Sequence, residues 1–265
     1  MQEKVKKILK VALIVFMILT ALAFWTEKAF YLLEYEEDLA WLPCHDSGDL
    51  AIIEIKGEIV TYFVESDEDE GSPDAVSSED VVYCLDKAKK NSGVKGVIFE
   101  IDSRGGSPVA SEEVMNVIKS LGKPTVSVIR ESGLSGAYLI ASATDRIFAS
   151  ELSDIGSIGV SMSYLDHSQQ NENEGIIYQQ LSSGKFKDTG DPDKPLSAEE
   201  KELFQRDLKI LHEAFVKNIA KNRKIDITKV EKMADGSSML GQMAKENGLI
   251  DEIGNTDSAK EWINK

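Results

Sequence analysis

The sequence predicts an α/β fold, and three observations support this expectation. Short apolar runs that are typical of buried strands occur at 97–101, 125–129 and 147–149. Segments of helical character, 108–121 and 135–143, lie between these runs. Strands that alternate with helices are joined by right-handed crossovers into a parallel sheet. We therefore expect repeated β-α-β units.

Further elements precede this region. Residues 50–57 form an apolar run closed by glycine and are predicted to be a strand. Ser77 or Ser78 can cap a helix that runs to about Asn91. The acidic stretch 65–73 is too charged to pack and is expected to be a solvated loop.

A long helix is predicted to follow Pro195, because Ser197 and Glu200 have the spacing of a capping box. Apolar residues then recur at helical spacing: Leu203, Phe204, Leu208, Leu211, Phe215 and Ile219. This face is expected to belong to the core or to contact a neighbouring subunit. The chain shows no internal repeat, which favours a single domain over a tandem duplication.

The N-terminus predicts a membrane anchor over residues 1–25. Four lysines precede an uncharged run, 11–25, and the helix could reach about 18 residues, near the lower limit for crossing a bilayer. The alternative is a cleaved signal peptide, because Ala21-Leu22-Ala23 has the small residues of a processing site. Residues 26–49 are expected to be a membrane-proximal linker and 50–265 the catalytic domain. The charge pattern places this domain outside the cytoplasm, on a single-pass protein of the cell membrane.

The net charge and the cysteine content limit which classes of ligand and partner the protein is expected to bind. The formal net charge of −16 argues against nucleic acid, whose phosphates it would repel. The two cysteines, Cys44 and Cys84, lack the paired spacing of a zinc site. A disulfide is possible outside the cytoplasm, but we expect two unpaired thiols. No metal, nucleotide or other cofactor is expected.

Ser135 is the candidate nucleophile. It follows a predicted strand and begins a predicted helix, so its hydroxyl would stand at the helix N-terminus beside the N–H of Gly136. Ser132 is the competing nucleophile, but it lies before the helical run. The simple alternative for Ser135 is a helix cap without chemistry.

A serine needs a base to take its proton, and an uncharged lysine amine can replace the usual imidazole. None of the three histidines (His45, His167 and His212) lies beside a glycine turn, although His167 remains the plausible competitor. Lys185 and Lys187, in Ser183-Gly184-Lys185-Phe186-Lys187-Asp188, are the candidate lysines. Either must be buried away from water and anions to lose its charge.

Four motifs occur in a recognisable order: Gly105-Gly106, Ser135-Gly136-Ala137-Tyr138, Gly156-Ser157-Ile158-Gly159-Val160 and Ser183 to Asp188. In order and spacing they resemble the signal peptide peptidase A (protease IV) family, peptidase family S49, over roughly Leu50 to the C-terminus. The resemblance implies a fold of the crotonase/Clp-protease kind. It also implies a membrane-associated serine endopeptidase that degrades hydrophobic peptides, such as cleaved signal peptides, through an acyl-enzyme.

The resemblance also assigns roles to residues. Lys187, immediately before Asp188, would be the general base, and Ser157 would orient its amine. Gly105, Gly106 and Gly136 would supply backbone N–H groups to an oxyanion. This chain has Ser103-Arg104-Gly105-Gly106 where the family usually has Ser-Pro-Gly-Gly, so the donor at this loop is left open.

Single-domain members of this family are understood to form closed rings or domes, so a homo-oligomer is expected. Lys187 follows Ser135 by 187 − 135 = 52 residues, and this separation leaves open whether they meet within a chain or between chains. A different class of function is a catalytically silent membrane scaffold of the same fold. A third is acyl-CoA chemistry, which the anchor and Lys187 argue against.

Overall fold

The computed structural model describes residues 17, 19, 20, 22, 24–26, 42–63 and 74–265. The chain divides into two compact units, Met1–Leu42 and Pro43–Lys265, and all the described strands lie in the second. Most of the predicted anchor and linker, and the acidic stretch 65–73, lie outside the described residues. In the part of the chain that is described, no helix combines the length and the apolar character needed to cross a bilayer.

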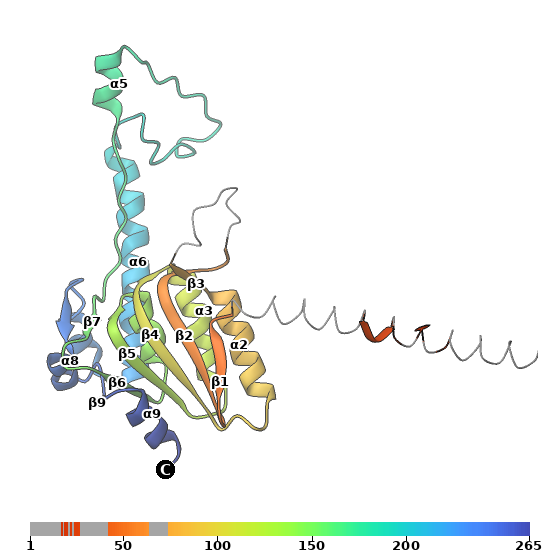
Figure 1. Cartoon of the computed structure of the whole chain (residues 1–265). Helices are drawn as coiled ribbons and strands as arrows, with labels where there is room; N and C mark the ends of the chain where they lie inside the picture. The colour runs from red at the N-terminus through yellow and green to blue at the C-terminus, as the bar shows by residue number, and fades with distance from the viewer. Residues whose placement is uncertain (1–16, 18, 21, 23, 27–41, 64–73) are drawn as a thin grey trace, which may run out of the picture. The chain divides into compact units, whose positions relative to one another are not determined.

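The second unit is an α/β domain, as the sequence predicts (Figure 1). Its strands are β1 (Cys44–Ser47), β2 (Leu50–Val60), β3 (Ala75–Ser77), β4 (Gly96–Gly106), β5 (Thr125–Leu134), β6 (Arg146–Ala149), β7 (Asp154–Gly156), β8 (Ser238–Leu240) and β9 (Glu252–Ile253). Its helices are α2 (Ser78–Lys90), α3 (Pro108–Lys119), α4 (Gly136–Ser142), α5 (Ser168–Glu174), α6 (Ala198–Arg223), α7 (Ile227–Glu231), α8 (Gly241–Asn247) and α9 (Thr256–Ile263).

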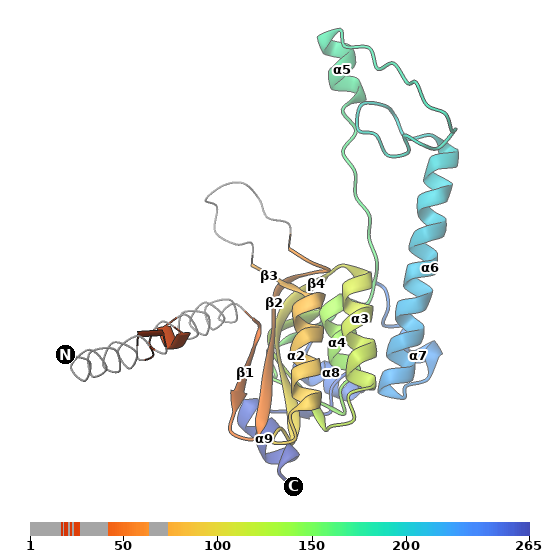
Figure 2. The same cartoon turned by 90° about the vertical axis from the view of Figure 1, so that its right-hand side faces the viewer.

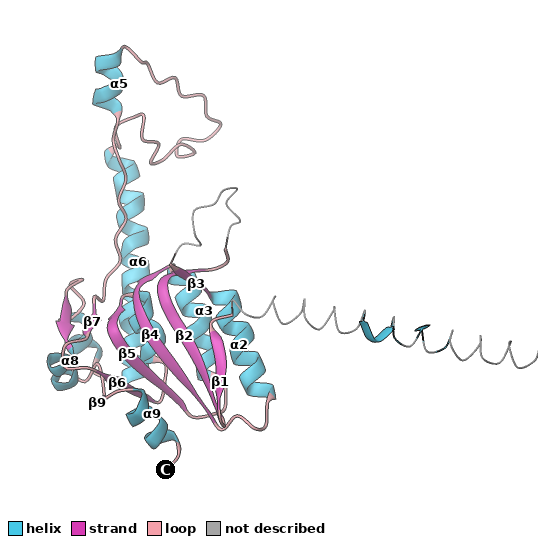
Figure 3. Ribbon diagram, in the orientation of Figure 1, coloured by secondary structure: helices cyan, strands magenta, loops and turns pink. Residues whose placement is uncertain are grey.

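The strands form one sheet with the order β1-β2-β4-β5-β6-β9 (Figure 3). The pairs from β2 through β4, β5 and β6 to β9 are all parallel, which confirms the predicted β-α-β units. β1 is antiparallel to β2 and forms one edge. β7 pairs in parallel with the C-terminal end of β5 and is antiparallel to β8. The parallel strands thus direct their C-terminal ends, and the turns after them, to one edge of the sheet.

Both faces of the sheet are buried, which explains the nearly continuous apolar runs of the strands. α9 covers one face, where Leu50, Ile98 and Val126 pack against Ala259. α2, α3 and α4 lie side by side on the other face (Figure 2). Tyr138 of α4 is fully buried, and its hydroxyl donates to the main-chain oxygen of Leu249. The buried ring of Tyr138 and its hydrogen bond to Leu249 therefore fix the position of α4, the helix that follows Ser135.

α6 begins with the capping box that the sequence predicts, between Ser197 and Glu200. Lys194 donates to the buried Glu200 carboxylate, and the two hydrogen bonds from Ser197 add to this contact. Together they lower the pKa of Glu200 to about 2. The N-terminal end of α6 is thus fixed by charge-assisted contacts.

Only the C-terminal part of α6 belongs to the core. Phe215 and Ile219 are buried, whereas Leu203, Phe204 and Leu208 are half-buried. Figures 1 and 2 show that α6 extends past the sheet and that α5 lies near its far end. We call residues 162–210 the arm. Its exposed apolar side chains are Met162, Tyr164, Leu165, Ile176, Ile177, Leu181, Phe186 and Ile210.

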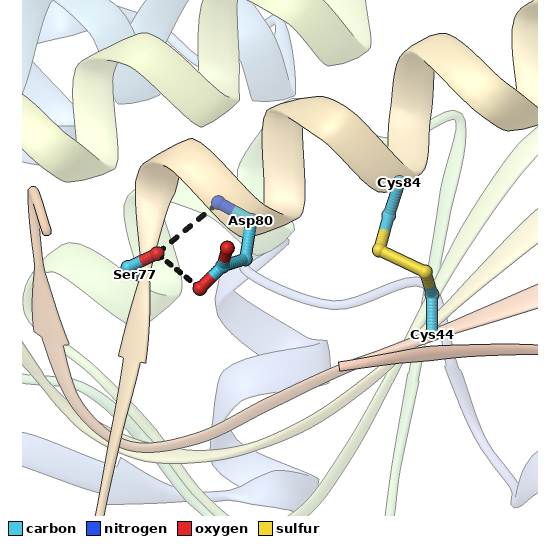
Figure 4. The surroundings of a disulfide bond; sticks show 4 residues. All are labelled: Cys44, Ser77, Asp80 and Cys84. Carbon is cyan, nitrogen blue, oxygen red and sulfur yellow. Dashed lines mark hydrogen bonds between the residues drawn. A yellow bond between two sulfur atoms is a disulfide. The ribbon is translucent and has the colours of Figure 1, made fainter. Parts of the chain in front are cut away.

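The two cysteines form a disulfide, so the expectation of unpaired thiols is wrong (Figure 4). Cys44 lies in β1, within the segment expected to be a linker, and Cys84 lies on α2. β1 adds to β2 as an edge strand, and α2 packs on the same part of the sheet, so the two Cα atoms come within 6.0 Å. The folded unit therefore begins at Pro43, ahead of the predicted boundary at 50.

Candidate active site

A cavity of about 730 Å³ opens where β4 and β5 end. Its walls come from the end of β4, the start of α3, the turn between β5 and α4, residues 157–161, the middle of α6 and residues 234–236. Ser135, Gly136, Gly106 and Ser157 all line it. Four of the residues nominated from the sequence thus share one cavity.

Ser135 occupies the turn between β5 and α4 in a strained conformation. Its φ of 50° and ψ of −123° lie in a region that residues with a Cβ rarely adopt. The Ser135 N–H donates to Gly156 O at 2.8 Å, which holds the turn in place. Ser135 stands at the N-cap position of α4, but its side chain makes no capping hydrogen bond, which argues against a role as an ordinary helix cap. A strained serine between a strand and a helix is the geometry that exposes a nucleophilic hydroxyl.

The two glycines after Ser103 lie against this turn. A Cβ at Gly105 would stand 2.8 Å from Gly136 N and 2.9 Å from Ser135 Cβ. The Gly105 N–H donates to Ser103 Oγ at 3.0 Å, so this expected oxyanion donor is already occupied. Gly105 shapes the loop instead, with a φ of +99°.

Gly106 and Gly136 retain N–H groups that can serve an oxyanion. Ser107, rather than Gly106, donates to Ile59 O of β2, so the Gly106 N–H points away from that strand. A Cβ at Gly136 would lie 3.6 Å from Gly106 N, so the two glycines are close. As the first residue of α4, Gly136 has an N–H outside the helix's own hydrogen bonds.

Replacing Gly105 with alanine should destabilise the domain more than the same change at Gly122. Both glycines have positive φ, but nothing lies within 4 Å of a Cβ at Gly122. Gly122→Ala should therefore cost about 1 kcal/mol of unfolding free energy through backbone strain alone. Gly105→Ala adds a clash and should cost at least about 3 kcal/mol in total. Chemical denaturation of the two variants measures the difference, and equal losses would show that the Gly105 loop moves aside freely.

Ser157 has the same kind of strain as Ser135, with a φ of 48°. Its N–H donates to Ser237 O at 3.0 Å, and its hydroxyl donates to Gly236 O at 3.1 Å. Within this chain its hydroxyl is thus bonded to main chain, and the predicted contact with Lys187 is not formed. Ser135, Ser157 and the helix-terminal Lys224 are the described non-glycine residues with positive φ, so two of the three strained positions line the cavity.

Lys187 lies in the arm, between α5 and α6, and its side chain is exposed. The segment that carries it lies near the far N-terminal end of α6, away from the sheet (Figures 1 and 2). The competing lysine, Lys185, is paired with Glu199 at 2.6 Å on the same part of the arm. Neither lysine lines the cavity. A single chain therefore brings the nucleophile and the glycines together, but not the lysine.

The other sequence candidates also lie outside the cavity. Ser132 donates its N–H to Asp102 and does not line the cavity. His167 is at the start of α5, on the arm. Among the described residues, no group of three or more His, Cys, Asp or Glu side chains could hold a metal ion.

Four charged or titratable residues line the cavity in addition to those nominated from the sequence: Arg104, Glu112, His212 and Asp235. Of these, His212 was considered as a base and set aside because no glycine turn lies beside it. Its position at the cavity could have been found from helical spacing, because it lies four residues after Leu208 and three before the buried Phe215. That spacing places it on the inner face of α6. The cavity thus has an apolar wall, which includes Val109, Leu139 and Phe215, and a charged rim.

Comparison with known proteins agrees with the family resemblance found in the sequence motifs. The model of peptidase family S49 matches residues 118–265. A protein of Enterococcus faecium that is named as a signal peptide peptidase is 36% identical over 184 residues. The alignment covers 68% of this chain and 54% of that protein. Protease 4 of Haemophilus influenzae is 29% identical over 242 residues, 88% of this chain and 38% of its own.

A plant protein is also similar. The chloroplastic serine protease SPPA of Arabidopsis thaliana is 30% identical over 188 residues, 70% of this chain and 28% of its own. In each of these alignments the chain spans little more than half of the relative's length, or less.

Proposed function

The chain belongs to peptidase family S49, and from that premise we propose that it is a serine endopeptidase that cleaves hydrophobic peptides, such as released signal peptides. The observation that carries the proposal is the strained Ser135, whose turn opens into a cavity beside the N–H groups of Gly106 and Gly136. The apolar wall of that cavity suits apolar side chains of a peptide.

In the proposed reaction, Ser135 Oγ attacks the carbonyl carbon of the scissile peptide bond while its proton passes to the uncharged amine of Lys187. The carbonyl oxygen becomes an oxyanion, which Gly106 and Gly136 stabilise with backbone N–H groups. The intermediate then expels the amine half of the peptide, which takes the proton from Lys187, and an ester remains on Ser135. Water attacks this ester, again with Lys187 as the base, and releases the acid half.

Lys187 is proposed to come from a second copy of the chain. The side chain of Lys187 is exposed on the arm, which also carries half-buried apolar side chains of α6, such as Leu203, Phe204 and Leu208. Packing of this arm against a neighbouring chain would bury those side chains and remove water from the amine. Burial of that kind favours the uncharged form that a base requires.

The domain is proposed to lie outside the cytoplasm, tethered to the cell membrane by the N-terminal segment. The disulfide between Cys44 and Cys84 supports this placement, because such bonds persist in oxidising compartments and are rare in the cytoplasm.

A fluorophosphonate probe tests the proposal, because it forms a covalent adduct only with an activated serine. Labelling of the detergent-solubilised full chain, followed by peptide mapping, should place the adduct on Ser135. Ser132→Ala should label like the wild type, since the contact of Ser132 with Asp102 uses its main-chain N–H, whereas Ser135→Ala should not label. An unlabelled wild type that cleaves no peptide would favour the silent scaffold.

A further inference from the structure

Two irregularities in the sheet face each other beside the candidate site. Between β2 and β4 the register jumps from Lys56↔Asp102 to Glu58↔Gly105, so Gly57 lies opposite two residues of β4. Gly57 has a φ of +69°, as a bulge of this kind allows. The pairing of β4 with β5 also shifts, between Ile101 and Ser103. Regular pairing of β4 with β2 is thus interrupted at Ser103 and Arg104 and resumes at Gly105, so contacts made at Ser103 bear on how the end of β4 is placed.

Ser103 supplies such contacts. Its side chain is 2% exposed, and its hydroxyl donates to Gly57 O at 2.5 Å. The same oxygen accepts the N–H of Gly105 at 3.0 Å. One buried hydroxyl thus links Gly57 of β2 to the bulged C-terminal end of β4, with a partner for its donor and for its acceptor.

The loop that Ser103 holds is the one that lies against the nucleophile. The space where a Cβ of Gly105 would stand is 3.0 Å or less from Gly136 N, Ser135 Cβ and Leu134 O. A small shift of Gly105 would therefore move the neighbouring Gly106 N–H relative to Ser135. Oxyanion stabilisation depends on donors fixed at about 2.7–3.1 Å from the developing charge, so it is sensitive to such a shift.

We propose that Ser103 is a positioning residue for the oxyanion donor of Gly106, an inference that rests on the proposed function. Ser103 does not line the cavity and so touches no substrate there. It acts by taking up the N–H of Gly105, which fixes the Arg104–Gly105 peptide plane, the plane just before the one that carries the Gly106 N–H. Its hydroxyl sets the distance between this donor and the carbonyl oxygen under attack.

Ser103→Ala tests the proposal, with Ser153→Ala as the matched control. Ser153 is 1% exposed, and its hydroxyl also accepts a main-chain N–H, from Ser150 at 3.0 Å, and donates to the main-chain oxygen of Arg130. It does not line the cavity. The two variants lose the same kind of buried hydroxyl, so their stabilities should fall by similar amounts.

The kinetics should separate the two variants. Ser103→Ala should lower kcat on the order of 100-fold with little change in KM, because a displaced donor affects the transition state and not substrate binding. Ser153→Ala should keep the wild-type kcat. Ser103→Cys keeps a weak donor of similar size, should give an intermediate kcat, and serves if the alanine variant does not fold. Hydrogen exchange of a peptide spanning 102–107 should quicken in Ser103→Ala only.

Three results would count against these ideas in distinguishable ways. An active wild type with an equally active Ser103→Ala overturns the inference alone. Unchanged hydrogen exchange at 102–107 also overturns it, since the loop would then not depend on the hydroxyl. A wild type that hydrolyses no peptide overturns the proposed function itself.

Discussion

Ser135→Ala and Lys187→Ala should each be inactive when purified separately, and a mixture of the two should hydrolyse peptide. Ser135 lines the cavity, whereas Lys187 belongs to the arm of the same chain and does not line it. A chain that retains Lys187 can then serve the intact Ser135 of its neighbour. Random co-assembly should restore about one quarter of the wild-type rate, because half of the chains carry each intact residue. Each variant alone should lose at least ~10³-fold in kcat.

The measurement is the initial rate of peptide cleavage after the two variants are unfolded and refolded together. The control is Ser135→Ala mixed with a double variant lacking both residues, which should stay inactive. Recovery in the control would point to wild-type contamination. A mixture with no activity, despite proven co-assembly, would mean that Lys187 reaches Ser135 within its own chain or is not the base.

Removing the disulfide should lower the free energy of unfolding more than the glycine substitutions do. The bond joins Cys44 to Cys84 over a sequence separation of 40 residues. Closing a loop of this size removes about 4 kcal/mol of conformational freedom from the unfolded chain in the entropic account. Cys44→Ala/Cys84→Ala should therefore unfold at a Tm lower by on the order of 10 °C. β1, the edge strand that holds Cys44, should separate first.

Wild-type protein in dithiothreitol is the control for this comparison, because it loses the bond without losing the side chains. Its Tm should match that of the double variant, and the double variant should not respond to the reductant. A double variant as stable as the oxidised wild type would show that β1 is held by its pairing with β2 alone.

Much of the fold can be derived from local sequence patterns. The apolar runs at 97–101 and 125–129 lie in β4 and β5, and the predicted helices at 108–121 and 135–143 match α3 and α4 within two residues at each end. These elements bury one or two faces, so their periodicity records the environment of the side chains. β1 was missed because Cys-His-Asp-Ser has no apolar pattern. It exists only because β2 offers a free edge.

The disulfide was missed for a related reason. Its formation depends on β1 running back along β2 beside α2, which is a property of topology and not of spacing. The continuation of β4 through Ser103 to Gly106 likewise depends on pairing with β2 across a bulge, and no local pattern encodes it.

The candidate site could be predicted in part. Ser135, Gly106, Gly136 and Ser157 are near one another because each lies at or just after the C-terminal end of a strand, where such turns converge. Lys187 does not follow a strand. It precedes α6, whose 26 residues span roughly 40 Å, and only the C-terminal part of that helix packs on the sheet. The surroundings of a residue on the arm depend on what the arm binds, and the sequence of one chain does not specify this.

The length of α6 has a consequence for where and when peptide bonds are cut. If the activating amine must arrive from another polypeptide, a newly made monomer is inert toward the unfolded proteins around it. Its turnover per molecule would then rise with enzyme concentration and fall on dilution. The amount of enzyme that the cell makes would therefore decide when proteolysis begins, and neither an inhibitor nor a cleavable pro-segment would be needed.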